Sequence, residues 1–227
     1  MKYWFIFFIL NYITGNIFFT IIILVVAYII LDKMCLNILS SLIFDPIKRR
    51  RRIKTLIVEL GLNPSNANSA MELGILYYES KKYVKAIEML DKANERIDYS
   101  PRLHAYKGMA CIERGDLQIG KDELLKALDM DISVIYGLPY IYLIRCELDS
   151  GKCNTDNLAQ LEKSISKYAT PENFYRLGKL YKNNKNSSKA IEMFSLSIKE
   201  YSYVQKKFRR IHRKWVWLSR LNKLTTR

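Results

Sequence analysis

Apolar residues between Leu56 and about Glu200 recur at intervals of three and four positions, and strand-like alternation is scarce. This spacing is typical of helices that each bury one face. The pattern therefore predicts an all-α body. Between residues 3 and 31 the pattern differs, because apolar residues run there almost without interruption.

A short motif recurs within the helical body. Residues 73–78 read LGILYY and residues 177–182 read LGKLYK, and the same offset of 104 relates KAIEML at 85–90 to KAIEMF at 189–194. A middle copy begins at Lys107. Self-similarity at a regular period indicates a repeat architecture.

Small residues set the period of this repeat. Three sets of them occur at spacings of 34 and 70 positions: Gly74, Gly108 and Gly178; Ala86, Gly120 and Ala190; Ala93, Ala127 and Ser197. Two helices approach closely only where side chains are small, so these positions are predicted to be helix–helix contacts. Seventy is two periods of 34 plus two residues. This predicts a divergent copy at about 135–170, with an insertion near residues 149–154.

The pattern of small and large residues resembles the tetratricopeptide repeat family, whose unit has 34 residues. The resemblance covers roughly residues 64–201 and implies a right-handed α-solenoid of helix-turn-helix repeats. Pro101 and Pro171 stand where units open, a place in a helix that proline tolerates. The third unit departs from the pattern, because neither register places small residues at its packing positions. The expected units are 67–100, 101–134, the divergent 135–170, and 171–201.

The resemblance also implies a concave groove, built from the first helix of each unit, that takes a protein or peptide ligand. Carried over from the ligand-facing positions of the family, the groove residues are Met71, Ile75, Tyr78, Arg102, Met109, Ile112, Tyr175 and Lys179. Such residues imply an adaptable apolar strip edged by charge. The clamp for a terminal carboxylate that the family uses needs Lys and Asn where this chain has Met71 and Ile75. That ligand is therefore not expected.

The apolar stretch near the start of the chain predicts a transmembrane anchor over residues 1–33. Ile17–Leu31 is almost purely apolar, and one tilted helix, densest over Asn11–Leu31, would cross a hydrocarbon core of about 30 Å. The aromatic residues at positions 3–8 are expected near an interface. A hairpin of Tyr3–Ile13 and Ile17–Leu31 is the alternative. A cleaved signal peptide is disfavoured, because no small-x-small cleavage site follows.

The net charge of +15 changes this picture, because two segments together account for all of it. The first segment has six basic residues and no acid among them: Lys48, Arg49, Arg50, Arg51, Arg52 and Lys54. By the positive-inside rule, they place the body in the cytosol, with the patch at an anionic membrane surface. Residues 34–63 are then a juxtamembrane segment: an interfacial helix ended by Asp45-Pro46, the basic patch and a lead-in helix. A single-pass protein of a bacterial inner membrane is expected, since no Arg- and Ser-rich transit segment occurs.

The second basic segment, residues 202–227, follows the last repeat. Phe208, Ile211, Trp215 and Leu218 recur at helical spacing, which predicts an amphipathic capping helix that buries this stripe on the last repeat. The candidate site residues of this basic helix are Arg209, Arg210, Arg213, Lys214, Trp215 and Trp217. Contact with an anionic membrane surface is the second interpretation. Nucleic-acid binding is the third and the least favoured, because no nucleic-acid motif supports it.

Candidate catalytic chemistry is sparse. The four cysteines form no C-x-x-C pair, and the seven-residue separation of Cys146 and Cys153 is poor spacing for a metal. No Ser-His-Asp, Cys-His or paired-carboxylate motif occurs. Gly115–Lys121 matches the glycine and lysine spacing of a P-loop, but Asp122 replaces the magnesium-binding Ser or Thr and no strand precedes it. We therefore expect no enzymatic activity, no metal and no cofactor.

Together these patterns predict a membrane-anchored, cytosol-facing adaptor without catalytic activity. Its repeats would bind a protein or peptide partner and recruit or assemble it at the membrane. One alternative is a protein that binds anionic lipid or nucleic acid through the basic C-terminal helix. Another is a structural subunit of a membrane complex, with Asn11 and Asn16 in a helix–helix interface.

Overall fold

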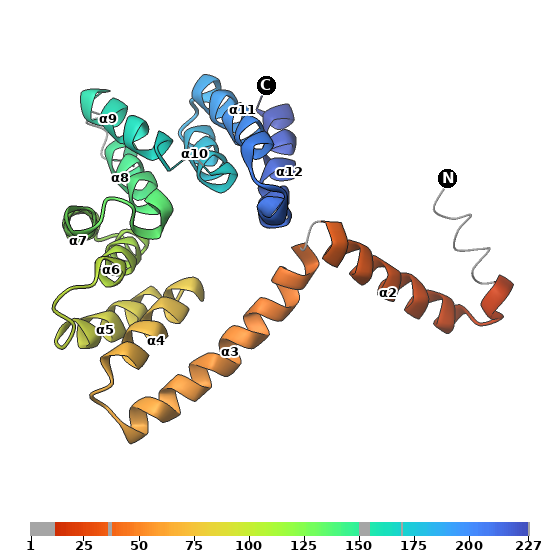
Figure 1. Cartoon of the computed structure of the whole chain (residues 1–227), viewed down its shortest axis with the longest axis horizontal. Coiled ribbons are helices and arrows are strands. Elements are labelled where there is room, and N and C mark those ends of the chain that lie inside the picture. The colour runs from red at the N-terminus through yellow and green to blue at the C-terminus, as the bar shows by residue number, and fades with distance from the viewer. Residues whose placement is uncertain (1–11, 36–37, 150–154, 169, 227) are drawn as a thin grey trace.

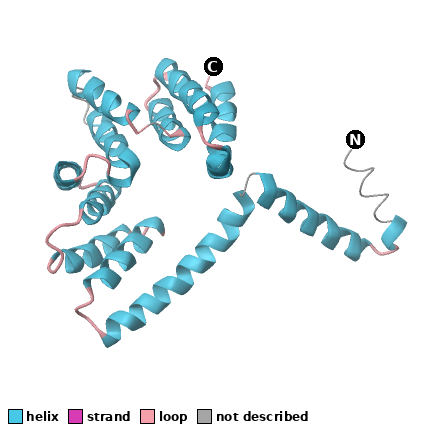
Figure 2. Cartoon of the chain, viewed as in Figure 1, coloured by secondary structure: helices cyan, strands magenta, loops and turns pink. Residues whose placement is uncertain are grey.

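The chain folds into helices joined by short turns, as the periodicity predicts. The computed structural model describes residues 12–35, 38–149, 155–168 and 170–226, and within these ranges it contains no strand (Figure 2). The prediction of an all-α protein is confirmed. The helices are α2 (Ile17–Cys35), α3 (Ile38–Leu62), α4 (Ala67–Glu79), α5 (Tyr83–Asn94), α6 (Pro101–Arg114), α7 (Leu117–Met130), η1 (Val134–Gly137), α8 (Leu138–Asp149), α9 (Thr155–Ser166), α10 (Pro171–Asn183), α11 (Ser187–Tyr203), η2 (Lys206–Phe208) and α12 (Arg209–Thr225).

The predicted single-pass membrane anchor is wrong. Within the described ranges, no helix is both long enough and apolar enough to cross a membrane. The helix expected over Asn11–Leu31 is interrupted at Gly15, whose φ is +61°, and α2 begins only at Ile17. The uncharged residues from Ile17 to Leu31 then span about 22 Å of helix, against a hydrocarbon core of about 30 Å. The expected location in a bacterial inner membrane depended on this anchor and is therefore also wrong.

Two further expectations concern the same region. The aromatic residues at positions 3–8 and most of the first half of the alternative hairpin lie outside the described residues. The interfacial helix was expected to end at Asp45-Pro46, but α3 continues through Pro46 to Leu62. The proline ring removes one backbone hydrogen bond from the helix. Packing of the following turns on α4 compensates for it: Leu56 has no exposed surface and lies among Leu73 and Tyr77.

Helices α4 to α12 follow one another in an arc, and each predicted unit contains one pair of helices (Figure 1). In three of the pairs, α4–α5, α6–α7 and α10–α11, the first helix carries a glycine and a large side chain of the second helix packs over it. A Cβ atom built on Gly74 would lie 2.7 Å from Cγ of Leu90, and one on Gly178 would lie 2.7 Å from Cε1 of Phe194. Leu90 and Phe194 are fully buried. Helix α11 ends at Tyr203, two residues beyond the expected unit, and the division into four units stays a prediction.

The divergent third pair, α8 and α9, begins with a left-handed turn. Ile135, Tyr136 and Gly137 all have positive φ, at 48°, 52° and 76°. Left-handed backbone costs a non-glycine residue about 1–2 kcal/mol, so other contacts must hold the turn. The amide of Asn173 donates to the Tyr136 carbonyl at 2.7 Å, and Gly137 packs against the ring of Tyr168. These two contacts hold the turn that opens the third pair.

The last helix, α12, packs on α11 and α10 with only part of the expected stripe, because Trp215 and Leu218 pack against the core and Phe208 and Ile211 do not. Phe208 and Ile211 are 47% and 61% exposed, whereas Val216 is 4% exposed and Ser219 is fully buried. The Ser219 hydroxyl donates to Ser197 at 2.8 Å. Ser219 and Ser197 are both fully buried, so this hydrogen bond lies inside the contact between α11 and α12. The prediction that Phe208 and Ile211 are buried is therefore wrong.

Candidate binding surface on the repeat helices

The eight predicted groove residues divide into a buried and an accessible group. Four of them pack inside the stack, with exposed fractions of 5% for Ile75, 0% for Met109, 2% for Ile112 and 8% for Tyr175. Met71 and Tyr78 are half-buried, and Arg102 and Lys179 are exposed. Side chains of neighbouring helices cover the four buried positions: Ile75 lies in one cluster with Leu90 and Leu103, and Tyr175 packs against Phe194 and Trp215.

A chain of hydrogen bonds crosses three of these helices. The Tyr78 hydroxyl on α4 lies 2.6 Å from that of Tyr142 on α8, and Tyr142 donates to the Glu113 carboxylate on α6 at 3.1 Å. Arg145 donates to the same Glu113 oxygen at 2.9 Å. Burial raises the pKa of Tyr142 to about 12, and burial also raises the pKa of Tyr78. Both hydroxyls are therefore protonated at neutral pH, and they tie the first helices of three pairs together.

Beside this chain lies a cavity of about 670 Å³ between α8, α10 and α12. Its lining combines aromatic, cationic and amide side chains. The lining residues are Leu138, Ile141, Tyr142, Arg145, Asp149, Tyr175, Arg176, Lys179, Leu180, Asn183, Asn184 and Trp215. A volume of this size suits a few side chains of a peptide. Of the predicted groove residues, only Tyr175 and Lys179 line it, and we call it the α8–α10 cavity.

The cations of the α8–α10 cavity differ in how far they are already neutralised. Arg176 pairs with Glu172 at 2.7 Å and lies 5.5 Å from the centre of the Trp215 ring. Arg145 pairs with Glu113 at 2.9 Å and with Asp149 at 3.4 Å. Lys179 is exposed and forms no ion pair within the described part of the chain. Lys179 is therefore the charge most available to an incoming carboxylate.

The sequence pattern missed Tyr142, Arg145 and Arg176, and it named Trp215 on the C-terminal helix but not as part of a groove. Tyr142 and Arg145 lie in the divergent third pair, where the spacing of small residues gave no register. Trp215 belongs to the helix after the repeats, whose Trp215–Tyr175 contact, with ring centres 5.4 Å apart, closes one side of the cavity. Arg176 follows Tyr175 directly on α10, and its guanidinium lies over the Trp215 ring of α12.

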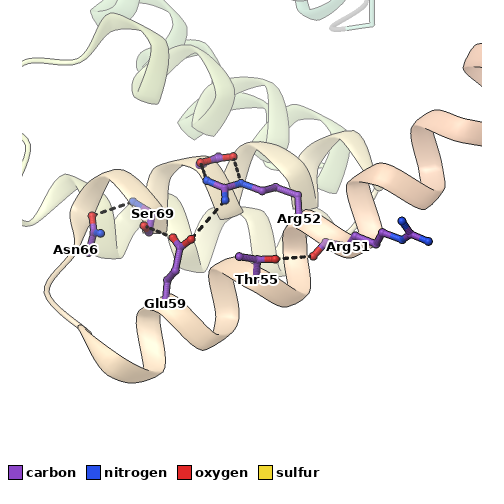
Figure 3. Close-up of polar contacts among 7 residues, drawn as sticks. Arg51, Arg52, Thr55, Glu59, Asn66 and Ser69 are labelled. Carbon is purple, nitrogen blue, oxygen red and sulfur yellow. Dashed lines mark hydrogen bonds and ion pairs between the residues drawn. The ribbon is translucent and has the colours of Figure 1, made fainter.

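The six basic residues on α3 do not act as one patch. Arg52 forms two hydrogen bonds of 2.7 Å to the Glu72 carboxylate and a weaker one of 3.4 Å to Glu59. Arg49 donates to Glu79 at 3.0 Å, so both arginines attach α3 to α4. In Figure 3 the Arg51 side chain points away from these contacts. The assignment of the patch to a membrane surface rested on the anchor and is not retained.

The basic residues of α12 also have separate surroundings. Arg209 donates to the backbone carbonyls of Val204 at 3.0 Å and Ser202 at 3.2 Å. Lys214 lies 4.7 Å from the centre of the Trp215 ring. Arg210 is exposed and Arg213 is half-buried. Trp217 is 56% exposed, in contrast to Trp215, which packs against the core.

The P-loop-like segment has a structural explanation. Gly115 ends α6 with a φ of +110°, a left-handed conformation that favours glycine. Gly120 lies in α7, where a Cβ atom would be 2.5 Å from Cγ1 of Ile112. Within the described ranges, no three His, Cys, Asp or Glu side chains are grouped as metal ligands would be.

Comparison with known proteins identifies the fold. No family model and no curated protein matches the chain. The crystal structure of MamA aligns with a TM-score of 0.52 and 18% identity, covering 66% of this chain and 87% of that one. The C-terminal part of a TPR repeat-containing protein from Cytophaga hutchinsonii aligns with the same TM-score and identity, covering 70% of this chain and 62% of that one. The chain therefore has a helical fold similar to that of tetratricopeptide-repeat proteins.

Proposed function

We propose that this protein is a non-catalytic scaffold that binds a peptide segment of a partner protein in the α8–α10 cavity. The mixed lining of that cavity is the observation that carries the proposal. Tyr175 and Trp215 offer apolar surface, and Lys179 and Asn183 offer a charge and hydrogen bonds at the rim. A short segment with one acidic and one apolar side chain would satisfy both groups.

The hydrogen-bond chain from Tyr78 to Arg145 supports this site, because it fixes side chains that a ligand would otherwise have to immobilise on binding. Tyr142 and Arg145 line the cavity and are already held by Glu113. A preorganised site loses less side-chain entropy on binding than a mobile one. The cavity is thus suited to recognition of an extended segment, and the solenoid fold is a common framework for such binding.

The test begins with a peptide array probed with the labelled full-length protein, followed by Kd measurement for the peptides that bind. Lys179→Glu is expected to weaken binding about tenfold, because it turns an attraction at the rim into a repulsion. Lys199→Glu, an exposed change of equal charge on α11, is the matched control and should leave Kd unchanged. Equal weakening by both variants, or an array without any binder, would refute the proposal.

A further inference from the structure

The outer face of α12 carries apolar side chains that the fold leaves uncovered. Trp217, Leu221 and Leu224 are 56%, 58% and 66% exposed. Their spacing of four and three positions places them on one stripe of the helix. Exposed apolar residues are ordinary when scattered, but a contiguous stripe on one face of a helix is typical of a surface for association.

A cavity of about 480 Å³ lies beside this stripe, between α11 and α12. Three aliphatic and two basic side chains line it: Ile191, Ile198, Arg220, Lys223 and Leu224. It shares no lining residue with the α8–α10 cavity. We call it the α11–α12 groove.

The groove is preformed, because several contacts hold α12 in place. Ser219 bonds to Ser197 at 2.8 Å, and Ser197 donates to the Pro171 carbonyl at 2.7 Å. Near the end of α12, the Lys182 ammonium donates to the Thr225 hydroxyl at 2.8 Å. These bonds join α12 to both α10 and α11, so the walls of the groove are set before any partner arrives.

The charge of the surface selects the partner. Residues 201–227 contain nine Lys and Arg and no Asp or Glu. Within the described residues, neither Arg220 nor Lys223 forms an ion pair. Two unneutralised cations at the rim of an aliphatic groove complement carboxylates that flank an apolar ridge.

We propose that the α11–α12 groove binds an acidic amphipathic helix of a partner protein. Aliphatic side chains on one face of that helix would pack on Ile191, Ile198 and Leu224. Carboxylates on either side of this face would pair with Arg220 and Lys223. A helix presents apolar anchors in a narrow row, which fits a groove between two helices. A phosphate backbone would leave the aliphatic walls without a partner. With the α8–α10 cavity, the protein would hold two different ligands at once.

The probe is a fluorescent synthetic helix of about 18 residues, with Leu at helical spacing and Glu elsewhere. Anisotropy with the full-length protein should show saturable binding that weakens as salt is raised. Two control peptides share its length: one has the same residues in scrambled order, and one has Lys in place of Glu. Both should bind at least tenfold more weakly. Equal binding of the scrambled peptide would reduce the interaction to charge alone and overturn the proposal.

Variants of the protein then locate the site. Arg220→Glu with Lys223→Glu is expected to weaken peptide binding more than tenfold, and Leu224→Ser severalfold. Lys206→Glu with Lys207→Glu makes the same charge change outside the groove and should have a much smaller effect. All the changed side chains are exposed, so each variant is expected to fold like the wild type. Circular dichroism checks this.

Three results would contradict the assignment. Equal losses in the groove variant and its control would remove the groove from the interaction. Self-association in sedimentation that Arg220→Glu abolishes would identify a second copy of the chain as the occupant. Tighter binding of phosphatidylserine vesicles or single-stranded RNA than of the peptide, lost in the same double variant, would assign the surface to another class of ligand.

Discussion

Replacing Gly120 by alanine is expected to lower the free energy of unfolding by about 3 kcal/mol. A Cβ atom at Gly120 would lie 2.5 Å from Cγ1 of Ile112 and 2.8 Å from the carbonyl oxygen of Gly108. A Cβ atom at Gly108 would in turn lie 2.8 Å from the carbonyl oxygen of Gly120. Because backbone faces backbone here, no side-chain rotation relieves the clash. The two helices α6 and α7 would have to move apart.

Urea unfolding followed by far-UV circular dichroism measures this effect. The matched control is Gly61→Ala, also within a helix, where a Cβ atom would meet nothing within 4 Å. Alanine there should stabilise the protein by up to about 1 kcal/mol, because it favours the helical backbone. If Gly120→Ala unfolds at the same urea concentration as the wild type, the close contact of α6 and α7 is incorrect.

Gly108 and Gly120 also show how far the sequence alone determines this fold. Their spacing relative to Gly74 and Ala86 predicted close helix contacts, since only a missing side chain lets two backbones approach. The same reasoning explains why the paired helices could be placed within a few residues. Small residues thus indicate where two helices that follow one another in the chain pack closely.

Contacts between helices of different pairs have no comparable signal in the sequence. Ile75, Met109 and Ile112 were expected in a groove, but the packing of one pair of helices on the next buries them. The α8–α10 cavity was not predicted, because its Tyr142 wall comes from the pair without a recognisable register. The buried hydrogen bond of Ser219 with Ser197 on the packed face of α12 is also a contact that the apolar periodicity of that helix does not encode.

Gly15 illustrates a third limit of structure prediction from the sequence pattern. Apolar content predicted one long helix near the start of the chain, yet composition does not say whether the backbone stays helical. The positive φ of Gly15, at 61°, breaks the run, and the Asn16 side chain accepts a hydrogen bond from the Phe18 amide at 2.8 Å. Such local bonds compete with helix continuation. The break leaves the apolar part of α2 too short for a crossing.

Replacing Glu123 by glutamine is expected to cost about 2–3 kcal/mol of stability at neutral pH. Glu123 is 7% exposed, and one carboxylate oxygen lies 2.6 Å from Nδ1 of His104. A carboxylate only accepts, so His104 donates from Nδ1. Its other oxygen lies 3.3 Å from the Lys107 ammonium, which also pairs with Asp91 at 2.7 Å. Glutamine keeps the shape of the side chain but removes the charge that holds these partners.

The loss caused by Glu123→Gln should depend on pH in a defined direction. Burial raises the pKa of Glu123, but the hydrogen bond from His104 and the charge of Lys107 outweigh it and hold the pKa below its ordinary value of 4.5. A lowered folded-state pKa contributes stability above the unfolded-state value, and the contribution is lost as pH falls through the folded-state value. The stability difference between wild type and variant should therefore shrink as pH falls below about 4.5.

Urea unfolding of both proteins from pH 7 down to pH 3 tests this dependence, because the difference between them cancels the titration of groups that do not contact Glu123. Glu192→Gln, an exposed change on α11, is the control and should differ little from the wild type at every pH. A difference for Glu123 that persists undiminished at pH 3 would mean that shape or geometry, and not the ionised carboxylate, stabilises the contact. Because His104 and Lys107 belong to α6 and Glu123 to α7, a shrinking difference would show that charge joins these two helices where their glycines let them meet.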